Sequence, residues 1–472
     1  MRGPLAATLC AALVALTGAC DEHVPPMEPP PPSELELRTL ITQWGVLPIA
    51  PVASQNAALV DLGRSLFFDK ILSGNRDVSC ADCHDPLAHG ADGLSLSVGT
   101  GGTGHGSTRT PGQGRQFLPR NAPSLLNLAV GSFYMFWDGR VEGRPEFLST
   151  PAGAAIPPGL TSLLAAQAMF PVVSREEMRG VAGDRDRFGA ANELAELGDS
   201  QFVEIWRAEM RRLMAVQAYV AKFNAAFPGT RPSELGFQHA ANAIAAFEID
   251  AFTRTNSPFD RFLLGDDAAL SAEARRGARL FFDRARCAQC HSGPLLGGQG
   301  FANVGSPQLG PGTGEARPLD FGRGGLIAQG GPLGPGGGGP PPPGSLPPLD
   351  AYRFAFRIPP LRNVELTAPY THAGAYATLE AVVRHYNDVL TAVRNFDVQQ
   401  LRPELRASYH GDDATINAML ETLDFRVREP LRLTEDERSD LVVFLKSLTD
   451  PSARDLSAIA PASVPSGLPV RE

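Results

Sequence analysis

The chain has 472 residues, of which 43% are hydrophobic, and a formal net charge of -9. This length suffices for two or more domains, and the hydrophobic share is typical of a globular protein. The negative charge argues against nucleic acid as a partner, and after the first residues no segment has the ~20 uninterrupted apolar residues of a membrane span.

Residues 1–20 have the features of an export signal. Met1 and Arg2 give a positive start, an apolar stretch follows, and Thr17-Gly18-Ala19-Cys20 resembles a lipoprotein cleavage box. Cleavage before Cys20 gives a lipid anchor on that residue, and the alternative is an ordinary secretory peptide cut near by. Both interpretations predict export, so we expect the protein in the periplasm.

The next segment leads from the signal to a first cofactor motif. Residues 21–55 are rich in Pro and acidic residues, which predicts a tether. Apolar residues at helical spacing then predict a helix over 57–72, followed by Cys80-Ala81-Asp82-Cys83-His84. CxxCH is the attachment signature of c-type haem, in which both thiols bond to the porphyrin and the His is positioned as an iron ligand.

The same arrangement occurs a second time. GRSLFFDK at residues 63–70 matches GARLFFDR at 277–284, and Cys287-Ala288-Gln289-Cys290-His291 follows. A zinc site that joins both CxxC pairs is the alternative, but it gives no reason for a His directly after each pair. The repeat therefore predicts two covalently bound haem c groups in two tandem cytochrome-c-like domains.

The domain boundaries follow from the repeat and from composition. Helical patterns continue to about residue 251, so we expect a first haem domain over residues 56–255 and a second over 256–450, in a mainly α protein. A stretch dense in Gly and Pro predicts a surface insertion at 305–350. Thr434 begins a capping box for a last amphipathic helix, and residues 451–472 form a tail.

Further motifs accompany the two CxxCH sequences in a fixed order. They are RNAPS at 120–124, FWDGR at 136–140 and LRNVELTAPY at 361–370. Over residues 57–450 this set resembles the bacterial di-haem cytochrome c peroxidases and their MauG-type relatives. The resemblance implies that the haem on His84 reacts with hydrogen peroxide, and that the haem on His291 receives electrons from a small donor protein such as a c-type cytochrome.

The resemblance also implies residues at the peroxide site. The family has a Gln and, ten residues later, a Glu before Met, which match Gln167 and Glu177-Met178 here. Glu177 is then the general acid/base and Gln167 its pocket partner, while a solvated helix residue is the alternative for Glu177. Trp137 matches a Trp between the haems that relays electrons, and an interdomain packing role is compatible with this.

The sixth ligand of the second haem departs from the peroxidase pattern. Peroxidases of the family have a Met fourteen residues after the His that matches His372, and this chain has Tyr386 there. MauG-type enzymes carry Tyr at this position, and a phenolate lowers the reduction potential relative to Met. We rank Tyr386 first as the ligand and His385 second, and a core aromatic is the alternative for Tyr386.

The loop of the first haem departs as well. Many peroxidases of the family hold a loop His on the peroxidatic iron, but the matching position is near Thr100 and has no His. His105 and His89 lie close by in the sequence. We expect both to be surface residues and the first haem to be open to peroxide, as in MauG.

The family also places a calcium ion between the haems. Asn121, Thr367 and Pro369 match its ligands, and oxygen donors suit Ca²⁺. Homodimers are common in the family, so by analogy we expect one here.

The leading function is reduction of hydrogen peroxide to water with electrons from a periplasmic donor. Tyr386 and the missing loop His favour a second function, MauG-type oxidation of a protein or organic substrate by peroxide. A third, a di-haem electron carrier without peroxide chemistry, is disfavoured by Gln167 and Glu177.

Overall fold

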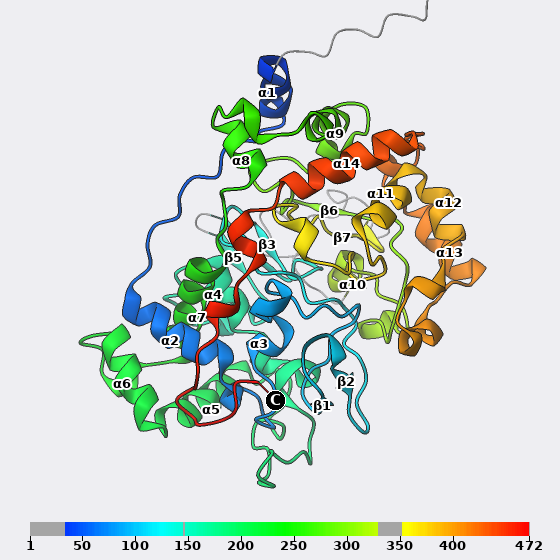
Figure 1. Ribbon diagram of the computed structural model, residues 1–472. Coiled ribbons are helices and arrows are strands. Elements are labelled where there is room, and N and C mark those ends of the chain that lie inside the picture. The colour runs from blue at the N-terminus through cyan, green and yellow to red at the C-terminus, as the bar shows by residue number, and fades with distance from the viewer. Residues whose placement is uncertain (1–33, 145–146, 329–351, 472) are drawn as a thin grey trace, which may run out of the picture.

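The computed structural model describes residues 34–144, 147–328 and 352–471. The described chain is mainly helical, with strands of two to four residues (Figure 1). The expected signal peptide, the anchor at Cys20 and the centre of the expected insertion lie outside these residues. None of the described helices is long and apolar enough to cross a membrane.

The first helical unit is built on the pair α2 (Ala57–Phe68) and α7 (Phe237–Phe252). Asn56 caps α2, since its side chain accepts the first free backbone N–H groups of the helix. The two helices cross at Gly63, where a Cβ would lie 1.9 Å from the carbonyl oxygen of Ala243. Only glycine permits this approach. Three more helices complete the unit's hydrophobic cluster: α4 (Leu163–Ala168), α5 (Phe202–Met214) and α6 (Gln217–Ala226).

The second helical unit repeats this crossing. Its central pair is α9 (Ala272–Phe282) and α14 (Glu435–Ser447), and a Cβ on Gly277 would lie 2.0 Å from the carbonyl oxygen of Asp440. Thr434 caps α14 with Glu437, which confirms the expected capping box. The remaining helices of this half are α8 (Pro258–Leu263), α11 (Leu379–Asn387), α12 (Val389–Arg394) and α13 (Asp413–Glu421).

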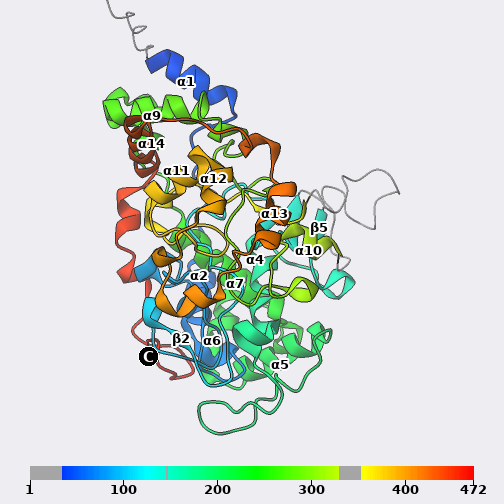
Figure 2. The same ribbon diagram turned by 90° about the vertical axis from the view of Figure 1, so that its right-hand side faces the viewer.

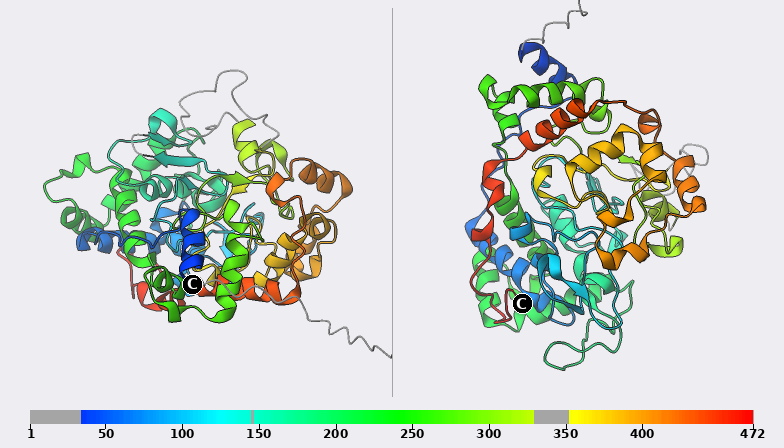
Figure 3. Two further views of the ribbon diagram at one scale, coloured as in Figure 1. Left: turned by 90° about the horizontal axis from the view of Figure 1, so that it is seen from above. Right: turned by 45° about the vertical axis from the view of Figure 1, so that its right-hand side comes forward.

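The two units lie at opposite ends of the molecule, and each chain end packs on the unit farther from it in sequence (Figures 2 and 3). The helix α1 (Glu34–Gln43) buries Leu37 and Ile41 in the cluster of the second unit. The tail buries Leu456 and Val464 in the cluster of the first.

The prediction of a tether over residues 21–55 was therefore wrong for Glu34–Gln43, which form the helix α1. The Pro-rich composition of the segment hid a short apolar face, which docks on α9 and supplies the hydrophobic burial that a ten-residue helix needs.

The described strands are short and antiparallel, and each sheet joins strands from the same half of the chain. A three-stranded sheet joins β3 (Tyr134–Met135), β4 (Val141–Arg144) and β5 (Phe147–Ser149). Two further pairs are β1 (Gly102–Thr103) with β2 (Thr110–Pro111) and β6 (Phe301–Ala302) with β7 (Phe356–Arg357).

The described part of the expected surface insertion is not confined to the surface. It contains α10 (Arg323–Ala328), and Gln308, Asp320 and Arg323 are at most 2% exposed. Gly312 and Gly322 have positive φ, which allows the tight turns that bring these polar side chains to buried partners. The expectation of a surface segment was therefore wrong for these residues.

Candidate functional site

A cavity of about 490 Å³ lies beside the first CxxCH. Cys80, Cys83 and His84 line it, and they come from the one-turn helix α3 (Cys80–Cys83) and its C-cap. His84 Nδ1 lies 3.0 Å from the carbonyl oxygen of Gly90, so this nitrogen donates and Nε2 is free for a metal. Burial lowers the pKa of His84, which keeps the imidazole neutral.

The cavity fits a covalently bound haem. Burial raises the pKa of Cys80 to about 12 and also raises that of Cys83, so both thiols are neutral at pH 7. The cavity has an apolar wall against which a porphyrin face would pack. The wall residues include Leu72, Val78, Leu118, Leu128, Leu164 and Ile244.

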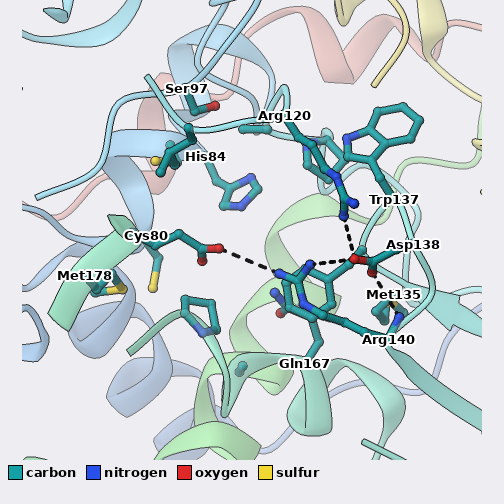
Figure 4. Close-up of a pocket in the computed structure, with 18 of the residues that line it drawn as sticks. Cys80, His84, Ser97, Arg120, Met135, Trp137, Asp138, Arg140, Gln167 and Met178 are labelled. Atoms are coloured by element: carbon teal, nitrogen blue, oxygen red, sulfur yellow. Dashed lines mark hydrogen bonds and ion pairs between the residues drawn. The ribbon is translucent and has the colours of Figure 1, made fainter. Parts of the chain in front are cut away.

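The structure brings the expected distal residues together in this cavity. Gln167 comes from α4, Glu177 from a π-helical turn at Arg175–Arg179, and Trp137 from the loop after β3, and all three line the wall. Figure 4 shows Gln167 and Trp137 in this wall. Burial raises the pKa of Glu177, and Arg140 works in the opposite direction. A carboxyl group with a raised pKa exchanges a proton more readily than an ordinary one, so Glu177 suits general acid/base catalysis.

A chain of charged residues extends from Glu177. Arg140 Nη2 lies 3.7 Å from Glu177 Oε1. Arg140 also donates to Asp138 at 3.1 Å, and Figure 4 shows these two side chains together. Asp138 accepts from Arg120 at 2.6 Å, and Arg120 grips Asp320 with two hydrogen bonds of 2.6 and 3.0 Å. The sequence analysis used only Trp137 of the FWDGR motif. Asp138 and Arg140 of the same motif were the signal for this row of charged residues.

Trp137 lies between this cavity and a second one of about 80 Å³, because it lines both. Its indole N–H donates to the carbonyl oxygen of Asn121 at 2.9 Å, and its own carbonyl oxygen accepts the backbone N–H of Arg357 at 2.7 Å. The ring is 8% exposed. Its position is therefore suited to both expected roles, packing and electron relay.

The second CxxCH has the same local geometry as the first. Cys287 and Cys290 flank a 3-10 turn (Cys287–Gln289), and His291 Nδ1 lies 2.9 Å from the carbonyl oxygen of Leu296. Burial lowers the pKa of His291 to about 4, so this imidazole is neutral as well. These residues fit a second haem c in the same way.

The two ligand candidates for the second haem differ in their contacts. Both ring nitrogens of His385 are occupied, one by the hydroxyl of Tyr376 and one by the carbonyl oxygen of Val304, each at 2.8 Å. The Tyr386 side chain is half-buried. Its removal from water raises the pKa of the phenol, and the Cys290 and Cys287 thiols raise it further. Tyr386 therefore lies in the electrostatic reach of the second CxxCH, while His385 is held away from a metal.

Neither loop histidine lines the first cavity. His105 lies 3.5 Å from Asp85 and 3.8 Å from Asp82, and His89 Nδ1 contacts the carbonyl oxygen of Ala453 at 3.0 Å. The Thr100 hydroxyl donates to Asp77. Both histidines are half-buried rather than fully exposed surface residues, and neither reaches the first cavity.

The three expected calcium ligands share one wall. Asn121, Thr367 and Pro369 line the 80 Å³ cavity, and the Asn121 amide nitrogen donates to the carbonyl oxygen of Leu94 at 2.6 Å, which leaves its side-chain oxygen free. Over the described ranges, no group of three or more His, Cys, Asp or Glu side chains could hold a metal ion. A cation here would depend on neutral oxygen ligands.

Sequence reasoning missed two more residues of the haem cavity. Glu248 from α7 is 7% exposed, and burial raises its pKa to about 8. Arg357 from β7 lines both cavities. No motif marked either residue, since their significance depends on which distant segments meet at the cavity.

Comparison with known proteins gives consistent results. Residues 57–268 match the family of di-haem cytochrome c peroxidases. The methylamine utilization protein MauG of Methylorubrum extorquens is 31% identical over 395 residues, with 84% of this chain and 79% of the relative covered. The cytochrome c551 peroxidase of Pseudomonas aeruginosa is 30% identical over 333 residues, with 71% and 72% covered.

Solved structures agree in fold. A MauG-like protein associated with microbial copper homeostasis superposes with a TM-score of 0.54 at 25% identity, covering 86% of this chain and 94% of the other. The di-haem peroxidase BthA of Burkholderia thailandensis gives a TM-score of 0.54 at 20% identity, with 91% and 98% covered. The chain belongs to the di-haem cytochrome c peroxidase family, which includes MauG.

Proposed function

We propose that this protein reduces hydrogen peroxide to water at the first CxxCH site, with electrons that enter through the second. The observation that carries this proposal is the placement of Glu177 and Gln167 in the cavity of His84. An electron carrier needs no acid/base group beside its haem, so this placement disfavours the third candidate function. Relatives named cytochrome c peroxidases support the same conclusion.

The reaction needs a proton to move between the two oxygens of peroxide. Cys80, Cys83 and His84 would hold the haem, which would supply the redox chemistry that cleaves the O–O bond. Glu177 takes the proton from the near oxygen and returns it to the leaving oxygen, and Gln167 orients the peroxide by hydrogen bonding. With two electrons and two further protons, the products are two water molecules.

Electrons reach the first site by way of Trp137. Its ring lines the cavities on both sides, and an indole can be oxidised and reduced reversibly. The donor is a small periplasmic protein such as a c-type cytochrome. Export by the leader, with a lipid anchor at Cys20 or without one, places the enzyme in that compartment.

MauG-type oxidation of a protein or organic substrate is the second candidate. The position of Tyr386 near Cys287 and Cys290, together with the occupied nitrogens of His385, favours a Tyr ligand as in MauG-type enzymes. Such a ligand lowers the potential of the second haem and so weakens its ability to accept electrons from a cytochrome. The same feature allows oxidising equivalents to be held at both sites.

Two further features belong to the proposal. Asn121, Thr367 and Pro369 bind Ca²⁺ through oxygens at the wall of the 80 Å³ cavity. The protein consists of two tandem cytochrome-c-like domains, for which the matching crossings at Gly63 and Gly277 are the support, and it forms a homodimer by analogy with the family.

The test is steady-state consumption of peroxide by the purified di-haem protein with reduced cytochrome c as donor and calcium present. Each assay is run with and without prior reduction. Fast turnover in both arms is the expected result. Negligible turnover, together with a lasting change of the haem spectrum on addition of peroxide, would favour oxidation of an organic or protein substrate instead.

A further inference from the structure

Arg357 is a buried cation whose side chain lacks partners. It is 2% exposed, and its Nε and Nη1 have no hydrogen-bond acceptor among the residues that the structure describes. Only its backbone N–H is occupied, by the carbonyl oxygen of Trp137. The residue lines the wall of both cavities. A buried guanidinium without a counter-charge is costly and calls for an anion at that point.

The other arginines of this region already have partners. Arg120 is paired with Asp138 and Asp320, and Arg140 is paired with Asp138. Arg323, which is buried to the same degree as Arg357, bonds the carbonyl oxygens of Asp138 and Gly139 and lies 3.4 Å from Glu142. Among these four arginines, Arg357 is therefore the one whose charge has no partner in the described residues.

No nearby carboxylate of the described chain balances Arg357. Burial alone lowers its pKa to about 10, so it remains protonated at neutral pH. Glu248 lines the same cavity, but burial raises its pKa to about 8, so it is mostly neutral at pH 7 and does not balance the charge. Among the residues that the structure describes, none supplies the anion, so a bound group can do so.

We infer that Arg357 binds a propionate carboxylate of the haem held by His84. Propionates are the only anionic groups of a haem, and the planar guanidinium fork matches a carboxylate in geometry and charge. This inference depends on the haem content of the family, and it does not depend on the peroxide reaction.

The small cavity supports this assignment. Arg357 and Arg362 both line it together with the proposed calcium ligands, but Arg362 is paired with Asp260 at 2.8 Å. A Ca²⁺ ion beside an unpaired guanidinium would be repelled. A propionate on Arg357 removes this repulsion, and it places a negative charge next to Trp137.

The experiment is a spectroelectrochemical titration of the di-haem protein between about pH 5 and pH 8. The titration is done in a Glu177→Gln/Glu248→Gln background, because both carboxyl groups line the same cavity and have raised pKa values. In this background the Arg357 cation keeps the propionate ionised, so we expect the potential of the first haem to be constant over this range. In Arg357→Gln the unpaired buried propionate acquires a higher pKa. The potential of the first haem in this variant should then be lower near pH 8. It should rise as the pH falls, because protonation of the propionate favours the ferrous state.

Arg323→Gln is the matched control, since it removes a buried arginine that already has partners, and its haem potentials should not depend on pH. With Glu177 and Glu248 replaced and Arg357 intact, a strongly pH-dependent first potential would overturn the inference, even if Arg357→Gln failed to fold. A flat profile in Arg357→Gln, or a change confined to the second haem, would overturn it as well. Peroxide turnover is measured separately. The potentials can therefore be interpreted even if the protein shows no peroxidase activity.

Discussion

The two CxxCH sites are alike in the segment that carries the Cys and His residues, and they differ in the residues that face these from elsewhere in the chain. In each, a helix crosses a later helix at a glycine, and a His follows whose Nδ1 contacts a backbone carbonyl oxygen at 3.0 or 2.9 Å. Beyond this, the first site faces a 490 Å³ cavity with Glu177 and Gln167, while the second has Tyr386 near its thiols. The repeated motif sets how a haem is attached, and the unrepeated residues set what it can do.

Removal of the Glu177 carboxylate should have the largest effect on the first site. In Glu177→Gln the side chain keeps its size but cannot exchange the peroxide proton, so we expect kcat/KM for peroxide to fall on the order of 100-fold or more. Stopped-flow and steady-state assays measure this loss.

Glu176→Gln is the control for that variant. Glu176 is the neighbouring residue and forms an ion pair with Arg317 at 3.0 Å. Its loss should change kcat/KM less than about twofold, as for an exposed ion pair. Equal losses in both variants would remove Glu177 from the mechanism.

Replacement of Tyr386 should change the second site alone. In Tyr386→Met a thioether takes the place of the phenol, so we expect the potential of the second haem to rise while that of the first stays the same. Redox titration followed by absorbance checks both. The companion His385→Gln removes the hydrogen bonds to Tyr376 and Val304, and it should leave the ligand signature unchanged. A lost signature in His385→Gln would instead make His385 the ligand.

Removal of Arg140 should produce a smaller effect that depends on pH. Arg140 lowers the pKa of Glu177 against the raising effect of burial. Without the guanidinium this pKa rises, and because the ionised carboxylate accepts the first proton, the acidic limb of kcat/KM should move to higher pH in Arg140→Met. Arg140→Lys should move it less. An unchanged limb in Arg140→Met would show that another group titrates.

Loss of the loop histidines should have the smallest effect. His105 faces Asp82 and Asp85, and His89 contacts Ala453. We expect His105→Ala and His89→Ala to turn over peroxide as the unaltered protein does, with and without prior reduction. A variant that gains activity only without prior reduction would identify that His as a ligand of the resting first haem.

Sequence reasoning predicted the parts that local patterns encode. Cys80, Cys83, His84 and their repeat gave the attachment residues, and the glycines of that repeat lie where each pair of helices crosses. The motif at 136–140 marked Trp137 as a residue between the two sites, and the structure has it in the walls of both cavities.

The remaining features depend on long-range contacts that no local pattern encodes. The helix α1 is stabilised by a surface more than 220 residues away in the chain, as the bonds of Arg38 to Phe262 illustrate. Arg120 and Asp320 meet across 200 residues. Arg357 lies in a two-residue strand, and only the cavities on both sides reveal its unpaired charge.

The most direct test of the contrast between the sites is rapid mixing of the fully oxidised di-haem protein with hydrogen peroxide. We propose that the first haem has an open coordination position, with Glu177 beside it and no loop His on the iron. We therefore expect the haem absorbance to change immediately, at a rate proportional to peroxide concentration, and this rate should be much lower in Glu177→Gln. Absence of any reaction until the second haem has been reduced would contradict it.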